Sequence, residues 1–302
     1  MANYIIAGGS GFIGKHIQSM LLAVGHDVYV LTRKKTNESV NKNLTYVQWN
    51  PAESYIDSNF QCKDAFIINL AGAGVAEKRW SQARKKLILE SRTQSLETLW
   101  NACASKQIHC LHITSASAIG FYGNGLQHFK EDDKGDQSYL SQTCQAWERA
   151  IEKFAELNIT FAIVRVGIVL GTEAGALKEF IKPMKWRIAG IPGSGKQIYS
   201  WIHIQDVARI FVYLTENKIQ GIYNAAADKP CSIKEIFNTL KKHYPILIEA
   251  HAPDWILKII LGEMAIEVLK STSVDNSKIK QIGFTFLHTN LETCLNDLLK
   301  KS

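Results

Sequence analysis

The sequence predicts an α/β fold in which a doubly wound parallel sheet is joined to a smaller, mostly C-terminal region. Over roughly the first half of the chain, short apolar runs typical of buried strands alternate with segments of helical spacing. A glycine-rich segment separates the first strand-like run from the first helical segment. After residue 166 the alternation stops and glycines begin to mark loops. Repeated strand–helix units favour a parallel sheet with helices on both faces.

The first strand–helix–strand unit lies at the N-terminus. Residues 3–7 form a short buried-strand run, and residues 28–31 form a second one, rich in β-branched and aromatic side chains. Between them a helix over residues 12–24 is predicted from the spacing of Ile13, Ile17, Met20, Leu21 and Val24. Gly25 follows at a position where helices commonly end.

Further strands of the same sheet are predicted at residues 64–71, 109–115 and 160–166. A long polar and amphipathic segment follows each of the first two strands, and a helix around residues 144–157 precedes the third. Residues 1–166 are therefore expected to form the first domain.

Residues 167–302 are expected to form mainly a second region. Its helices are predicted at residues 205–215, 232–243, 254–270 and 290–299. The C-terminal helical extension comprises about residues 250–302. The sequence also allows segments such as residues 198–224 to return to the first domain. Because no long linker separates the two parts, they are expected to pack directly on each other.

Composition excludes several classes of protein. No uninterrupted apolar stretch reaches the roughly 18 residues of a membrane-spanning helix, so no membrane partner is expected. The net charge is +7, yet the longest basic run is residues 33–35, so nucleic-acid binding is not expected either. The N-terminal apolar run has no basic leader, and the six cysteines form no Cys-x-x-Cys pair. These features predict a cytoplasmic protein with free thiols and no metal site.

The glycine-rich segment is the strongest functional motif. It comprises Gly8, Gly9, Ser10, Gly11, Phe12, Ile13 and Gly14. In such a turn bare backbone can approach a pyrophosphate, and the helix N-terminus supplies amide donors and a positive dipole. Its place between a strand and a helix predicts a Rossmann-type dinucleotide site rather than a structural glycine turn.

The spacing of these glycines also resembles the short-chain dehydrogenase/reductase superfamily, specifically its extended, epimerase-like branch. The resemblance continues through nearly the whole chain, in residues 69–72, 115–123, 201–208 and 223–226. A narrower likeness, at residues 79–81, 91–92, 144–148, 193–197, 261–263 and 283–284, is to an uncharacterised subgroup with a short extra C-terminal domain. The resemblance implies cofactor contacts for Asn69, Leu70, Ala71, Gly72 and Ser115.

The end of the second strand predicts NADP(H) as the cofactor. Rossmann sites that prefer NAD place an acid roughly 20 residues after the glycine loop, where it accepts the ribose 2′-hydroxyl. Here the strand ends on Thr32 and Arg33, and the first later acid is Glu38. Arg33 can hold a 2′-phosphate by charge-assisted hydrogen bonds, with Thr32 as a neutral donor. A solvated basic turn at residues 33–35 is the alternative.

The resemblance does not carry over the superfamily's proton-transfer pair. That pair is Tyr-x-x-x-Lys on one helix face, where the ammonium group lowers the pKa of the phenol. When Glu148 is matched to the glutamate that follows the lysine, Leu140 and Cys144 occupy the tyrosine and lysine positions. The remaining catalytic candidates are Ser117, at the end of a strand, and Tyr122, in the loop after it. A structural hydroxyl and a packing aromatic are their respective alternatives.

Several other polar and aromatic groupings are expected to be structural. Glu148 and Arg165 are predicted to form an ion pair between a helix and a strand, and His203 with Asp206 is assigned to packing. Core packing is also the simpler interpretation of three tryptophans that could instead line a substrate pocket: Trp147, Trp186 and Trp201.

These observations predict an NADP(H)-dependent oxidoreductase that acts on an unidentified small carbonyl or alcohol substrate. One alternative is a non-catalytic NADP(H)-binding regulator, linked to cell division by the label that some members of the subgroup carry. A second is a nucleotide-sugar epimerase or dehydratase. It is disfavoured because Tyr199 and Ser200 stand where such enzymes often carry a phosphate-binding arginine. The sequence is compatible with an oligomer.

Overall fold

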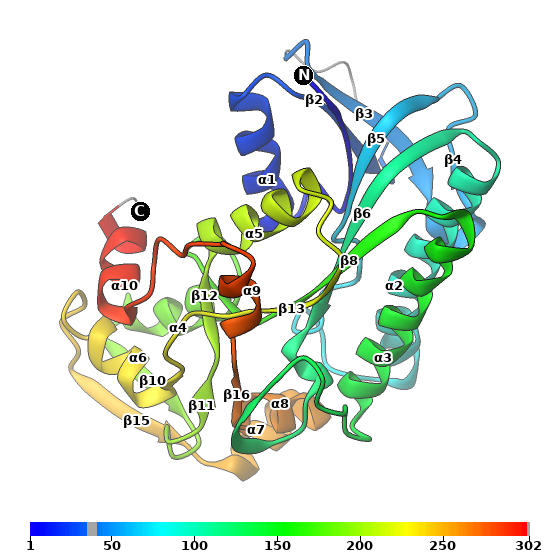
Figure 1. The fold of residues 1–302 in the computed structure, drawn as a ribbon. Helices are drawn as coiled ribbons and strands as arrows, with labels where there is room; N and C mark the ends of the chain where they lie inside the picture. The colour runs from blue at the N-terminus through cyan, green and yellow to red at the C-terminus, as the bar shows by residue number, and fades with distance from the viewer. Residues whose placement is uncertain (35–40, 301–302) are drawn as a thin grey trace.

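A computed structural model describes residues 1–34 and 41–300 of the chain. At its centre is an eight-stranded sheet in the order β13-β8-β6-β5-β1-β2-β3-β4 (Figure 1). All neighbouring strands are parallel except β3 and β4. The strands are β1 (Asn3–Ala7), β2 (Asp27–Thr32), β3 (Leu44–Asn50), β4 (Tyr55–Ile56), β5 (Cys62–Asn69), β6 (Ile108–Ala118), β8 (Thr160–Val166) and β13 (Gly221–Ala225).

Helices cover both faces of this sheet. On one face α1 (Phe12–Ala23) packs against α5 (Ile204–Glu216), and on the other α2 (Gln82–Ala104) packs against α3 (Tyr139–Glu152) (Figure 1). Strands are added on either side of β1, which is the arrangement of a Rossmann-type doubly wound sheet. The predicted fold class is confirmed.

The first strand–helix–strand unit forms nearly as the sequence predicts. Every residue of β1 after Asn3 is buried, because helices cover the sheet on both faces. α1 buries Ile17 and Leu21, which lie one turn apart on its inner side. The helix ends at Ala23, and Gly25 follows with a left-handed φ of 81°.

The other predicted strands correspond to β5, β6 and β8, with β6 extending further than expected. Because β6 continues to Ala118, Ser117 lies within the strand and pairs with Arg165 of β8. The helix predicted around residues 144–157 begins earlier, at Tyr139, because Ser138 caps its N-terminus. After Glu152 it tightens into a 3-10 turn.

The single helix predicted over residues 254–270 is wrong. The structure has two short helices there, α7 (Asp254–Leu261) and α8 (Ala265–Leu269), separated by a 3-10 turn. At the break Gly262 has a left-handed φ of 64°, which ends the first helix. The apolar residues keep a helical spacing on both sides of this turn, so the spacing alone predicted one continuous helix. The helices predicted at residues 205–215, 232–243 and 290–299 are present.

A smaller region packs below the sheet (Figure 1). Its remaining elements are β7 (Gly125–Phe129), β9 (Ile168–Leu170), α4 (Ala176–Met184), β10 (Ile188–Pro192), β11 (Ile198–Tyr199), β12 (Trp201–His203), β14 (Cys231–Ser232), α6 (Ile233–Leu240), β15 (Ile248–Ala252), β16 (Thr272–Val274), α9 (Ser277–Gln281) and α10 (Leu291–Lys300). The two parts exchange segments. β7 joins β16 in a small sheet, whereas α5 and β13 return to the large sheet.

The core follows from this arrangement. One apolar cluster runs from the large sheet into the smaller region, as direct packing without a linker requires. All six cysteines are buried and unbridged. None of the helices in the described part of the chain combines the length and the apolar character needed to cross a membrane.

Candidate functional site

The glycine-rich loop folds tightly against the ends of β1 and β5. Gly8 has a φ of 80°, a left-handed conformation that glycine adopts without strain. A Cβ atom at Gly8 would lie 2.8 Å from the carbonyl carbon of Leu70, and one at Gly14 would lie 2.5 Å from the carbonyl oxygen of Gly8. Real side chains do not tolerate contacts this short. Glycine is therefore required at both positions for the loop to close.

The start of α1 has the character of an anion site. Gly11 is the N-cap residue, and no side chain accepts a hydrogen bond from the first turn. The first amides of a helix have no acceptor within the helix, and its dipole adds positive charge there. Ser10 and Gly11 are exposed. A dinucleotide pyrophosphate fits this loop, because no side chain caps the first turn of α1 and the two residues before the helix are exposed.

The ends of β5 and β6 are tied together next to this loop. Asn69 and Ser115 are register partners, and Nδ2 of Asn69 donates to Oγ of Ser115 at 3.2 Å. Oδ1 of Asn69 accepts the N–H of Ala71, also at 3.2 Å. Both side chains are buried, so they shape the strand edge from within. A direct cofactor contact by residues 69–72 or Ser115 stays a prediction.

β2 ends beside the glycine loop. Because Ala7 of β1 pairs with Leu31 of β2, Thr32 and Arg33 lie at the same edge of the sheet as Gly8. The hydroxyl oxygen of Thr32 accepts a backbone N–H two residues on, at 3.2 Å. Among the described residues none accepts the O–H group of Thr32, which can serve as a donor.

The Arg33 side chain is exposed at this edge. It lines a cavity of about 290 Å³ together with Gln48, Trp49, Asn50, Glu53 and Tyr55. A guanidinium here has the charge and the donor geometry for a 2′-phosphate. Lys35 and Glu38, which follow in the same segment, lie outside the described residues.

α3 carries the positions that correspond to the superfamily's tyrosine and lysine. A Cβ atom at Gly120 would lie 3.5 Å from Cβ of Leu140 and 4.0 Å from Sγ of Cys144, so both side chains face the turn after β6. Burial raises the pKa of the Cys144 thiol to about 11, so the thiol is protonated at neutral pH. Neither residue supplies a phenol or an ammonium group. The standard proton-transfer pair is absent from this helix.

Ser117 belongs to a buried hydrogen-bond network. Its Oγ donates to Oε1 of Glu148 at 2.6 Å. Glu148 also accepts from Nε and Nη2 of Arg165, at 2.9 and 2.8 Å. The helix-to-strand ion pair expected from the sequence is therefore present, and it is bidentate. Because the Ser117 proton points at a carboxylate, Ser117 can donate to a substrate only after leaving that acceptor.

Tyr122 is enclosed by the same network. Its side chain is 0% exposed, and its hydroxyl donates to Oδ1 of Asn224 and accepts from Nη1 of Arg165, both at 2.8 Å. The ring stacks on Phe129. Burial raises the pKa of the phenol to about 12. In this arrangement Tyr122 packs the protein interior, and the catalytic role predicted for it would require its release.

Arg92 of α2 is a residue to which the sequence analysis gave no role. Its Nη1 donates to the carbonyl oxygen of Ala73 at 3.0 Å and to that of Ile88 at 2.8 Å. A Cβ atom at Gly72 would lie 3.0 Å from Cζ of Arg92. The sequence contains one signal for it: the apolar residues Ile88 and Leu96 stand four residues before and four after Arg92, which puts all three on one face of a helix. The structure buries both apolar residues.

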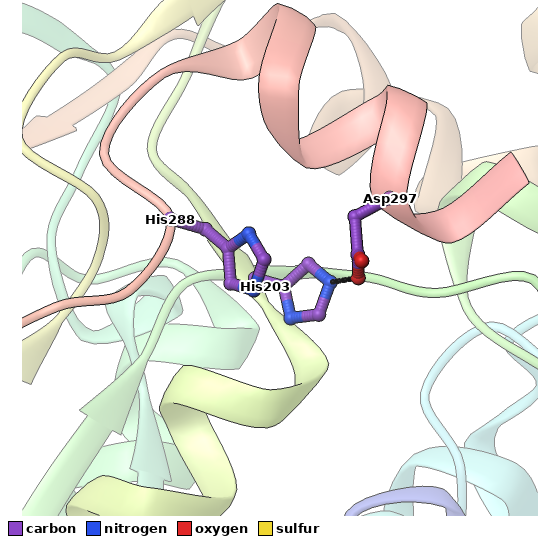
Figure 2. Close-up of side chains that lie close together, drawn as sticks. All are labelled: His203, His288 and Asp297. Carbon is purple, nitrogen blue, oxygen red and sulfur yellow. Dashed lines mark ion pairs between the residues drawn. The ribbon is translucent and has the colours of Figure 1, made fainter. Parts of the chain in front are cut away.

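A histidine cluster lies where α5 begins. Figure 2 shows His203, His288 and Asp297 close together, with one ligand atom from each within 4.8 Å of the others. The two imidazole rings are stacked, with centroids 3.7 Å apart and planes at 19°, so they do not converge on one ion. Nδ1 of His203 accepts the N–H of Gln205, so a neutral ring carries its proton on Nε2, which faces Asp297 at 3.4 Å. This geometry ties α10 to α5 and does not suit a metal.

The remaining groupings lie at the surface or make structural contacts. Trp186 is 82% exposed, whereas Trp201 is buried and donates Nε1–H to the backbone. Buried Asp206 accepts the N–H groups of two residues before α10. His112 is buried and His109 is exposed, as expected for opposite faces of a strand.

Comparison with known proteins identifies the family. Residues 4–226 match the model of the NAD dependent epimerase/dehydratase family, and residues 252–298 match a domain of unknown function, DUF1731. The chain is 33% identical to the epimerase family protein YfhF of Bacillus subtilis, over 98% of both proteins. It is also 33% identical to an epimerase family protein of Staphylococcus aureus, over the full length of both.

Solved structures show the same fold. Human epimerase family protein SDR39U1, solved with NADPH, has a TM-score of 0.86 at 23% identity, over 99% of this chain and 100% of the human one. MoeE5, solved with UDP-glucose and NAD, has a TM-score of 0.77 at 20% identity, over 99% and 98% of the two chains. The resemblance to extended, epimerase-like proteins with an extra C-terminal domain is confirmed. The chain belongs to the NAD dependent epimerase/dehydratase family.

Proposed function

We propose that this protein is an NADP(H)-dependent oxidoreductase acting on a small carbonyl or alcohol substrate. The observation that carries the proposal is the glycine loop, where Gly8 and Gly14 exclude side chains and the uncapped start of α1 follows. Such a loop binds the pyrophosphate of a dinucleotide. The family supports a nicotinamide cofactor. When bound, that cofactor supplies hydride exchange at a carbonyl or alcohol carbon.

We assign the phosphorylated cofactor because of the charge at the end of β2. Thr32 ends β2 and Arg33 follows it, where NAD-preferring sites hold an acid. A charged hydrogen bond contributes about 1.5–3 kcal/mol, which corresponds to a preference for NADPH over NADH of roughly 10- to 150-fold. Human SDR39U1 was solved with NADPH and MoeE5 with NAD. Arg33, rather than the fold, therefore supports the choice.

Proton transfer is the weak step of the proposed reaction. Leu140 and Cys144 cannot perform it, and a positioned acid or base contributes about 10²- to 10⁴-fold in rate. Of the two predicted donors, Ser117 has one acceptor to leave, whereas Tyr122 has to break contacts with both Asn224 and Arg165. We therefore assign the donor role to Ser117 first, and we expect turnover slower than in enzymes with the tyrosine and lysine pair.

A second candidate function is a non-catalytic NADP(H)-binding regulator. The engagement of Ser117 by Glu148 and the enclosure of Tyr122 favour it, because both arrangements keep the protein's hydroxyl groups away from a substrate. A nucleotide-sugar epimerase is less well supported. Tyr199, at the position of the usual arginine, is buried and donates its hydroxyl to the carbonyl oxygen of Val268.

Calorimetry with NADPH and NADH tests the cofactor assignment. We expect the NADPH preference to fall to near unity in Arg33→Ala and to persist in the neighbouring control Lys34→Ala. Equal affinities in the unmodified protein would contradict the assignment.

A carbonyl library with NADPH then tests the reaction, followed by Ser117→Ala and Tyr122→Phe on any substrate found. No turnover across the library, with NADPH binding intact, would favour the regulator.

A further inference from the structure

Arg92 is a partly buried cation with no acidic partner. Within the described residues no carboxylate lies within 4.0 Å of its guanidinium. Other cations of α2 are paired, Arg84 with Glu77 and Lys85 with Glu263. Removing a charge from water is costly unless a counter-charge or hydrogen bonds compensate for it. Backbone hydrogen bonds satisfy one nitrogen of this guanidinium, but no described carboxylate neutralises its charge, so its remaining edge can hold an anionic ligand.

The orientation of Arg92 leaves one edge of its guanidinium available. Nη1 is held by the carbonyl oxygens of Ala73 and Ile88, one from the loop after β5 and one from α2. Nε and Nη2 make no hydrogen bond with any described residue. These two groups form the flat side of the guanidinium, whose parallel N–H bonds match the two oxygens of a carboxylate. The backbone contacts hold this fork in place before a ligand arrives.

Arg92 packs against α3, the helix that carries the superfamily's proton-transfer positions. The guanidinium lies over the ring of Trp147 in α3, with Cζ 4.9 Å from the ring centroid. Gly72 gives it room, because a side chain there would meet the guanidinium. Arg92 thus lies between the segment predicted to contact the cofactor and the helix that carries the superfamily's proton-transfer positions.

We propose that Arg92 binds an oxyanion of the substrate, specifically the carboxylate of a small oxo acid or hydroxy acid. The assignment deepens the proposed oxidoreductase function, on which it rests, by naming the class of substrate. The glycine loop already offers amides to the cofactor pyrophosphate, whereas Arg92 contacts α3. A phosphate group presents the same pair of oxygens, so a phosphate-bearing carbonyl compound is the source to be distinguished by experiment.

Binding measurements test the assignment without requiring turnover. The probes are 2-oxobutanoate, 3-oxobutanoate and 4-oxopentanoate, each beside its neutral amide, with glyceraldehyde 3-phosphate as the phosphate-bearing probe. Calorimetry is performed on the full chain loaded with NADP⁺ and without it. We expect at least one carboxylate to bind about 10-fold or more tightly than its amide. We expect Arg92→Gln to abolish that preference, and Arg92→Lys, which keeps the charge and loses the fork, to retain only part of it.

Control variants distinguish a loss of anion binding from a loss of folding or of cofactor binding. Arg149→Gln, on the exposed side of α3, should leave all affinities unchanged. NADPH affinity and the melting temperature of Arg92→Lys should stay close to those of the unmodified protein. Equal affinities for carboxylates and amides, or binding of neither, would overturn the inference. So would a preference for the phosphate probe alone, or a loss of NADPH affinity in Arg92→Lys with carboxylate binding intact. Failure of the carbonyl library alone would overturn the oxidoreductase proposal and not the anion site.

Discussion

Replacing Glu148 by glutamine tests whether the network around Ser117 is a structural device. Glu148 is 7% exposed and accepts one hydrogen bond from Ser117 and two from Arg165. The glutamine side chain has nearly the same shape as that of Glu148 and still offers an oxygen that accepts from Ser117, but it carries no negative charge. Arg165, 2% exposed, would then be a buried cation without its counter-charge. Breaking one side of a buried ion pair costs about 3–5 kcal/mol, a large share of the roughly 5–15 kcal/mol that stabilises a typical fold.

Urea unfolding of Glu148→Gln measures this cost. Pairing the substitution with Arg165→Met completes a double-mutant cycle, in which the double variant should lose less stability than the sum of the single variants. The exposed pair of Glu179 and Lys182 provides the control, because Glu179→Gln should change the free energy of unfolding by about 1 kcal/mol or less. A loss below about 1 kcal/mol in Glu148→Gln would refute the argument that this network holds the fold.

Three further predictions follow from particular contacts. Gly14→Ala places a methyl group 2.5 Å from the carbonyl oxygen of Gly8, so NADPH binding in calorimetry should be lost, and stability should fall by about 1–3 kcal/mol. Burial lowers the pKa of His112 to about 4 from its ordinary value near 6.5, so the unfolded chain takes up this proton first as the pH falls. Stability should therefore decline between pH 6.5 and 4, by about 3 kcal/mol more than in His112→Asn, as urea unfolding across that range would show. Common nucleoside-diphosphate sugars should not be epimerised in an NMR assay, because Leu140 and Cys144 stand at the proton-transfer positions.

The strands and the cofactor loop were predictable because local sequence determines them. β1 reads as a continuous apolar run since both of its faces are covered, and Gly8 and Gly14 are required by contacts within a single strand–turn–helix unit. The division of the chain was less predictable. β7 lies within the first domain in sequence and pairs with β16 in the small sheet, because strand pairing depends on the tertiary fold rather than on position along the chain.

The side-chain partners at the site could not be predicted in the same way. The sequence places Ser117 and Tyr122 near the end of β6, yet their hydroxyl groups donate to Glu148 and Asn224, which lie 31 and 102 residues away. A period-two pattern indicates which face of a strand a serine occupies and says nothing of which distant carboxylate meets it. The ion pair of Glu148 with Arg165 was predictable as a pairing, but not its contact with Ser117.

Arg165 and Arg92 differ in their partners, and this difference distinguishes a structural arginine from one that can bind a ligand. Nε, Nη1 and Nη2 of Arg165 all donate, to Glu148, to Tyr122 and to a backbone carbonyl. With its charge neutralised, Arg165 gains nothing from a ligand and serves the fold. Arg92 uses Nη1 alone, has no carboxylate partner in the described chain, and lies against Gly72. A partly buried cation that folding leaves without a counter-charge costs stability, and a bound anion would supply that charge. The sequence alone does not distinguish Arg92 from Arg165, whereas the hydrogen-bond partners seen in the structure do.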